Sequence, residues 1–144
     1  MPFDVRLVDD GKGAIYTGSG VLTGRDIQDT VIAMLDADEK LAALRYALVD
    51  LTGIERSEVA TDDLRVISEM VKGAKAKLSK RCMAIAATSD LAFGLARMYS
   101  AFVPGVGWEV GVFKDLAKAH SYIESNVGER FSFGVEHDSI CETG

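Results

Sequence analysis

The residue types that most often carry catalysis are few and widely spaced in this 144-residue chain. His120 falls in the last expected helix and His137 in the tail, while Cys82 opens an apolar run and Cys141 lies near the C-terminal end. These four residues form no Cys-x-x-Cys pair and no Cys/His set at metal-ligand spacing. We therefore predict no catalytic site, no metal site and no bound cofactor, since an enzyme needs an activated nucleophile, an acid/base pair or such a group.

Carboxylates and glycines give no stronger catalytic pattern. The acidic pairs, such as Asp9-Asp10 and Asp62-Asp63, stand at the ends of expected elements, where solvated caps and turns are their usual role. The glycines between Tyr16 and Gly24 and at 105–107 match neither the dinucleotide fingerprint nor the P-loop, and we interpret them as turns. The sequence thus predicts a protein that is not an enzyme.

The composition and the net charge of the chain limit the kinds of partner that it could bind. Apolar residues make up 48% and charged residues 26%, as in ordinary globular domains, and the length suits a single core. A formal charge of −6 repels nucleic acid and anionic lipid surfaces. Neither a signal pattern at the N-terminus nor an apolar run of about 18 residues is present, so we expect a cytoplasmic protein without an integral membrane segment.

The elements that would position a site begin with a predicted hairpin. Residues 5–8 and 14–18 have extended patterns on either side of a turn-forming cluster at 9–13. Thr23 stands three residues before Asp26, the spacing of a capping box, and apolar residues then recur at helical spacing. We expect a first helix over 24–39.

A second strand and helix follow. The strand centres on Leu48, Val49 and Leu51, continues into a loop at 56–61, and precedes a helix that Thr61 is expected to cap. Five basic residues gather where that helix should end: Lys72, Lys75, Lys77, Lys80 and Arg81. Pairing with the helix C-terminus explains them, and a partner-binding patch is the alternative.

The last two helices differ in character. A strand over 83–87 ends at Thr88-Ser89-Asp90, which offers an N-cap to a helix with apolar residues on more than one face. Gly94 inside this helix predicts close packing against another element. A strand over 108–113 and a final helix capped by Asp115 complete the pattern.

Strands and helices thus alternate, which predicts an α/β domain with a mixed, mainly parallel sheet of about five strands and four helices. We assign residues 1–125 to this domain and 126–144 to a C-terminal extension. In the extension Phe131, Phe133 and Val135 alternate with Ser132 and Gly134, so it could add a strand, cover the apolar helix or act as a dimer arm.

Two segments carry a family resemblance. Leu48-Val49-Asp50-Leu51-Thr52-Gly53-Ile54-Glu55 resembles the strand that leads to the regulatory loop of STAS domains. The run from Ile85 to Tyr99 is similar to small bacterial SpoIIAA-like proteins of the STAS/Sec14 type, which have no assigned function. The resemblance covers nearly all of the chain except the tail, and it implies a single SpoIIAA-like domain.

In switchable STAS domains an Asp-Ser-Ser-Gly motif opens the second helix, and one serine accepts phosphate from a kinase. The resemblance places those two serine positions on Val59 and Ala60, neither of which can carry phosphate. Ser57 and Thr61 are nearby, but the acidic residues around them would repel a phosphate. We therefore expect a non-catalytic STAS-like interaction module without the phosphorylation switch.

Two binding hypotheses remain open. The protein could meet itself or another protein through the apolar helix, with a homodimer as the commonest closed form. Alternatively, this helix and the last strand could enclose a cleft for a lipid or another small apolar ligand. The candidate residues for either role are Leu91, Phe93, Leu95, Met98, Tyr99, Phe102 and Trp108.

Overall fold

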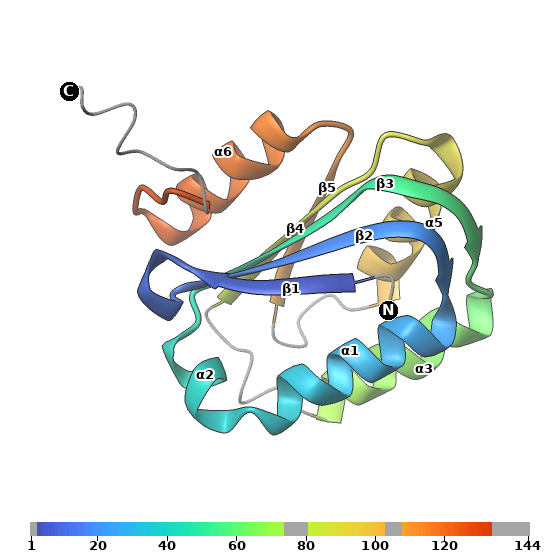
Figure 1. Ribbon diagram of the computed structural model, residues 1–144, viewed down its shortest axis with the longest axis horizontal. Helices are drawn as coiled ribbons and strands as arrows, with labels where there is room; N and C mark the ends of the chain where they lie inside the picture. Colours follow the sequence, from blue (N-terminus) through green and yellow to red (C-terminus); the bar gives the residue numbers. More distant parts are fainter. Residues whose placement is uncertain (1–2, 74–80, 103–107, 134–144) are drawn as a thin grey trace.

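A five-stranded sheet forms the centre of the molecule (Figure 1). The computed structural model describes residues 3–73, 81–102 and 108–133. The strands lie in chain order as β1 (Phe3–Val8), β2 (Gly13–Thr23), β3 (Tyr46–Glu58), β4 (Arg81–Ala86) and β5 (Trp108–Phe113). β1 is antiparallel to β2, whereas β2 to β5 pair in parallel. The predicted mixed, mainly parallel sheet is confirmed.

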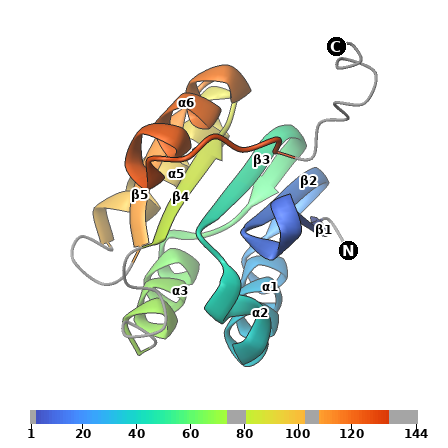
Figure 2. The ribbon, with the colours of Figure 1, turned by 90° about the vertical axis from the view of Figure 1, so that its left-hand side faces the viewer.

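Helices cover both faces of the sheet. They are α1 (Gly24–Asp36), α2 (Asp38–Ala43), α3 (Thr61–Gly73), α5 (Asp90–Phe102) and α6 (Leu116–Val127), and a 3-10 turn η1 (Asp9–Gly11) joins β1 to β2. α1 and α3 lie on one side of the sheet and α6 on the other (Figures 1 and 2). α5 shares the side of α1 and α3, since its buried residues belong to the same apolar cluster.

Strand alternation divides the core into two clusters. Along β3, Ala47 and Leu51 point toward α1, α3 and α5, while Tyr46 and Leu48 point toward α6. β4 alternates in the same way, with Met83 on the first face. Both faces of the central strands are therefore buried, which explains their nearly continuous apolar sequence.

The predicted helix starts at 24, 90 and 116 are confirmed by their caps. Thr23 and Asp26 form a capping box: the Asp26 N–H donates to Thr23 Oγ1 at 3.2 Å, and the Thr23 N–H donates to Asp26 Oδ2 at 3.1 Å. Ser89 Oγ accepts from the Ala92 N–H at 3.1 Å, and Asp115 Oδ1 accepts from the Lys118 N–H at 2.8 Å. These signals lie within three residues of each helix start, where sequence alone is informative.

The helix expected over 24–39 is divided. α1 ends at Asp36, and Ala37 leaves the helical region with φ −96° and ψ 68° before α2 begins at Asp38. The Ala37 N–H closes the last turn by donating to the Met34 carbonyl at 3.3 Å. The chain therefore changes direction three residues earlier than predicted.

The expected loop at 56–61 is shorter than predicted, since residues 56–58 belong to β3 and only Val59 and Ala60 separate that strand from α3. Gly18 and Gly20, expected in turns, lie in β2, which runs beside β3 until Thr23 pairs with Glu58. The pairing register shifts next to Ser19 and Val21. Gly20 has φ +69°, a conformation that favours glycine. The register shifts are β-bulges, and they bend the paired ends of β2 and β3 away from the plane of the rest of the sheet.

Two expectations for single residues also fail. Thr61 was predicted to cap α3, but Asp63 Oδ2 accepts from the Ala60 N–H at 2.8 Å, and the Thr61 hydroxyl lies 3.6 Å from the Met98 sulfur. Gly94 was predicted to pack closely, yet it is exposed and a β-carbon there would meet nothing within 4 Å.

The basic cluster is only partly described. Lys72 pairs with Glu69 at 3.3 Å, and Arg81 donates from Nε to the Leu44 carbonyl at 2.8 Å. Lys75, Lys77 and Lys80 lie outside the described residues.

Candidate functional site

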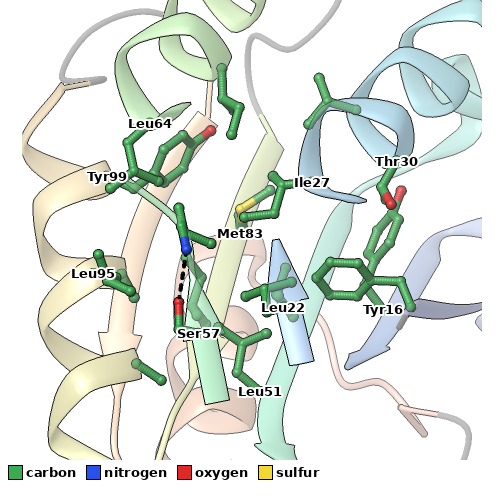
Figure 3. Close-up of a pocket in the computed structure, with 18 of the residues that line it drawn as sticks. Tyr16, Leu22, Ile27, Thr30, Leu51, Ser57, Leu64, Met83, Leu95 and Tyr99 are labelled. Atoms are coloured by element: carbon green, nitrogen blue, oxygen red, sulfur yellow. Dashed lines mark hydrogen bonds between the residues drawn. The ribbon is translucent and has the colours of Figure 1, made fainter. Parts of the chain in front are cut away.

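An apolar cavity lies between the sheet and the helices α1, α3 and α5 (Figure 3). Its volume is about 120 Å³. Its lining residues come from β1 to β4, the end of β3 included, and from all three helices. They include Leu22, Ile27, Met34, Leu51, Ile67, Val71, Met83, Ile85, Leu95 and Ala96. The apolar stripes that the sequence indicated on these helices thus converge on one space.

Four hydroxyl-bearing residues interrupt this lining: Tyr16, Thr30, Ser57 and Tyr99. Two of them are already paired, because Thr30 Oγ1 donates to the Asp26 carbonyl at 2.8 Å and Ser57 Oγ accepts from the Val59 N–H at 3.3 Å. The second of these bonds is drawn in Figure 3. Ser57 only accepts in its bond, so its O–H and the two phenols could each donate to a polar atom in the cavity.

Tyr16 and Tyr99 are 7% and 9% exposed. Within the described part of the chain, neither hydroxyl has a hydrogen-bond partner. Burial raises the pKa of each phenol to about 12, so both stay protonated at neutral pH. Each can donate one hydrogen bond to a guest, since a buried hydroxyl without a partner costs free energy.

The candidate residues on α5 divide between two surfaces. Leu95 and Tyr99 line the cavity, whereas Leu91 and Met98 are 59% and 38% exposed on the outside. Phe93 is half-buried, and the Lys114 Nζ lies 4.9 Å above the centre of its ring. The side chains of Phe102 and Trp108 lie outside the described part of the chain.

The positions corresponding to the STAS phosphoserines stand between β3 and α3. Val59 lines the cavity, and the exposed Ala60 donates its N–H to Asp63. Ser57 belongs to β3 and is half-buried, while Thr61 is the first residue of α3. Neither Val59 nor Ala60 carries a hydroxyl, so this junction presents no phosphate acceptor at the two motif positions.

Asp9 anchors the C-terminal segment through hydrogen bonds that no sequence pattern indicated. Its carboxylate accepts from the Tyr46 hydroxyl at 2.6 Å, from the Ser132 N–H at 2.9 Å and from the Phe133 N–H at 3.2 Å, and the Ser132 hydroxyl donates to it as well. Burial alone would raise the pKa of Asp9, but these hydrogen bonds together lower it. The acidic turn residue had no signal that could connect it to a segment more than a hundred positions away.

The segment that Asp9 holds, residues 129–133, covers the α6 face of the sheet. Phe131 lies 4.6 Å from Tyr46 between ring centres, and the buried Phe133 stacks on His120 at 4.0 Å. The described part of the predicted extension therefore packs on its own domain, and its first residues, 126–127, belong to α6. Residues 134–144, including His137 and Cys141, lie outside the described part.

The two remaining catalytic candidates, His120 and Cys82, lie on the α6 side of the sheet. His120, expected at the surface or at a helix end, is instead half-buried under Phe133, and burial lowers the pKa of its imidazole despite the opposing charges of Glu124 and Asp50. Burial raises the pKa of the Cys82 thiol to about 11, with a further contribution from Glu109. Cys82 is therefore a protonated core residue at neutral pH, as the sequence predicts.

Neither a metal cluster nor a membrane-spanning helix occurs among the described residues, 3–73, 81–102 and 108–133. These residues contain no group of three His, Cys, Asp or Glu side chains that could hold a metal ion. No helix among them is long and apolar enough to cross a membrane.

The arrangement is similar to a solved structure. An uncharacterized protein of the DUF3478 family from Shewanella loihica PV-4, described as having a SpoIIAA-like fold, matches 84% of this chain and 91% of its own with a TM-score of 0.51. The chain has a SpoIIAA-like fold. The two sequences are 24% identical, so the match concerns the fold. No family model and no curated protein matches the chain.

Proposed function

We propose that this SpoIIAA-like domain is a non-catalytic binding module that holds a small apolar ligand between its sheet and helices α1, α3 and α5. The observation that carries the proposal is the cavity of about 120 Å³ with its apolar lining. An engineered apolar cavity of about 150 Å³ stays dry and binds benzene. A cavity of comparable size has room for a single ring.

The size of the cavity also limits which apolar ligands can fit inside it. A long acyl chain needs several times the volume of one ring, so a membrane lipid is a poor fit. The unpartnered hydroxyls of Tyr16 and Tyr99 favour a ring with one hydrogen-bond acceptor. We therefore take the ligand class to be a monocyclic aromatic compound, in place of the lipid that the sequence left open.

The non-catalytic part of the proposal is supported by the state of the candidate groups. Cys82 is protonated at neutral pH, and His120 is stacked under Phe133. Val59 and Ala60 replace the serines through which STAS switches receive phosphate. A cytoplasmic location and the lack of nucleic-acid partners stay predictions from the sequence.

Thermal unfolding with toluene, anisole and decanoate as probes tests the cavity, since anisole is a single ring with one ether oxygen that can accept a hydrogen bond. A probe at about ten times its Kd stabilises the fold by about 1.4 kcal/mol, which raises Tm by a few degrees in a chain of this length. We expect toluene and anisole to raise Tm and decanoate to have no effect. Methyl chemical shifts of Leu95 and Val71 should move with the same two probes.

A matched pair of variants on α5 locates the binding. Ala96→Leu places three extra carbons in the cavity and should abolish the Tm increase, whereas Ala101→Leu places them on the exposed side of the same helix. If neither ring probe shifts the Tm or the methyl signals of the wild type at millimolar concentration, the proposal is wrong.

The outer face of α5 supports a second candidate, contact with a partner protein. Leu91 and Met98 stand two turns apart on one exposed face of the helix. Cross-linking in the host, followed by mass spectrometry, should give an adduct with the wild type and lose it with Leu91→Glu. An adduct that survives Leu91→Glu would remove α5 from the interface.

A further inference from the structure

The outer edge of β1 is separate from the exposed face of α5, and β1 reaches the cavity only through Phe3 among the described lining residues. β1 is the first strand in the sheet order and pairs with β2 alone among the described strands (Figures 1 and 2). Residues 4–7 are all exposed, and Val5 and Leu7 reach 50% and 44%. An edge of this kind presents backbone N–H and C=O groups that can pair with another strand.

The two faces of β1 differ in chemistry. Val5 and Leu7 are opposite Tyr16 and Ala14 of β2, so they share the face that carries the larger apolar cluster. Asp4 and Arg6 point to the other face. The edge therefore has an apolar row on one side and an opposite-charge pair on the other.

We propose that β1 pairs with β1 of a second copy of this chain, antiparallel and with the twofold axis at Val5. In this register Val5 meets Val5, and Phe3 meets Leu7 on the apolar face. Asp4 of each copy meets Arg6 of the other. The five-stranded sheets of the two copies then join into one continuous sheet, and the contact is isologous as a twofold requires.

Charge complementarity favours this register over those shifted by one or two residues. Moving one strand by two residues places Asp4 against Asp4 or Arg6 against Arg6, and like charges directly opposite are unfavourable. Moving it by one residue turns the apolar side chains to the charged face. The alternation of residues 3–7 thus matches itself only when Val5 lies on the axis.

The expected dimer is weak. One short strand pair buries less than the roughly 1,200 Å² of a specific, stable interface. We therefore expect a dissociation constant in the micromolar range or above and rapid exchange between monomer and dimer. Sedimentation velocity over a range from low micromolar to near millimolar concentration should resolve the equilibrium.

Charge reversal tests the register. Asp4→Arg and Arg6→Asp each create two like-charge contacts across the axis, and each should raise the dissociation constant by at least about tenfold. The double variant Asp4→Arg/Arg6→Asp restores opposite charges and should dimerise as the wild type does. An equimolar mixture of the two single variants should form a heterodimer, although neither associates alone.

The controls separate this surface from others and from misfolding. Arg25→Asp reverses an exposed charge on α1 and should leave the equilibrium unchanged, and circular dichroism should show that all variants are folded. A wild type that is monomeric near millimolar concentration overturns the proposal. So does a dimer that both single reversals leave intact, or one that Leu91→Glu on α5 dissociates.

Discussion

Asp9 connects the first turn of the chain to the segment after its last described helix. It has φ +53°, a left-handed conformation that aspartate and asparagine tolerate better than most residues. This conformation directs the carboxylate at Tyr46, Ser132 and Phe133 at the same time. The energetic cost of this backbone conformation is thus offset by the hydrogen bonds that the Asp9 carboxylate accepts from several donors.

Asp9→Asn should destabilise the protein by about 2–3 kcal/mol, because an amide has one acceptor oxygen for donors that now share a carboxylate. Urea unfolding monitored by tyrosine fluorescence measures the change. Asp10→Asn is the matched control: Asp10 has nearly the same φ, +56°, but is exposed. A loss of similar size in both variants would assign the effect to the turn and not to the hydrogen bonds.

His120 makes stability depend on pH. The unfolded chain binds a proton near the ordinary value of 6.5, while burial holds the folded imidazole to a lower pKa. Between these two values the unfolded state binds more protons, so stability falls as pH drops below the ordinary value. Urea unfolding between about pH 7.5 and pH 5.5 should show this decline, since histidine is the side chain that ordinarily titrates there.

His120→Phe keeps an aromatic ring against Phe133 and removes the titrating group. The variant should therefore lose the part of the pH dependence that lies above the carboxylate range. An unchanged profile in His120→Phe would show that another group is responsible.

At the scale of elements, α5 has a position where a substitution should raise the stability of the fold. Gly94 lies inside the helix with open space around its α-carbon, so Gly94→Ala should raise stability by about 0.5–1 kcal/mol. Gly111→Ala in β5 should have the opposite effect, because its β-carbon would approach the rings of Phe113 and Tyr122 to 2.8 Å. Thermal unfolding of both variants gives the comparison, and a destabilising Gly94→Ala would contradict the open environment.

Element order and three of the helix starts could be predicted from sequence because their signals are local. Thr23, Ser89 and Asp115 act within one helical turn, and apolar periodicity identifies each strand. The lengths of β2 and β3 could not be predicted. Their glycine-rich and polar ends resemble loops, and only the pairing between them makes them strands.

At the scale of the whole molecule, the candidate site was predicted in part. Helical spacing identified Leu95 and Tyr99 on α5, and both line the cavity. The opposite wall depends on how α1 and α3 pack over the sheet, which no local pattern encodes. Among the described side chains, the cavity is therefore bounded by β1 to β4 and not by the last strand, where the sequence had placed a cleft.

The hydrogen bonds between Asp9 and Ser132 join residues 123 positions apart. During synthesis the aromatic surface around Tyr46 has no cover from Phe131 and Phe133 until these two residues have left the ribosome. Closing so long a loop also comes late in folding, because its entropy cost is met only after the sheet has formed. The nascent domain therefore exposes this apolar face until residues 131–133 emerge, and a chain stopped before residue 131 would keep it exposed.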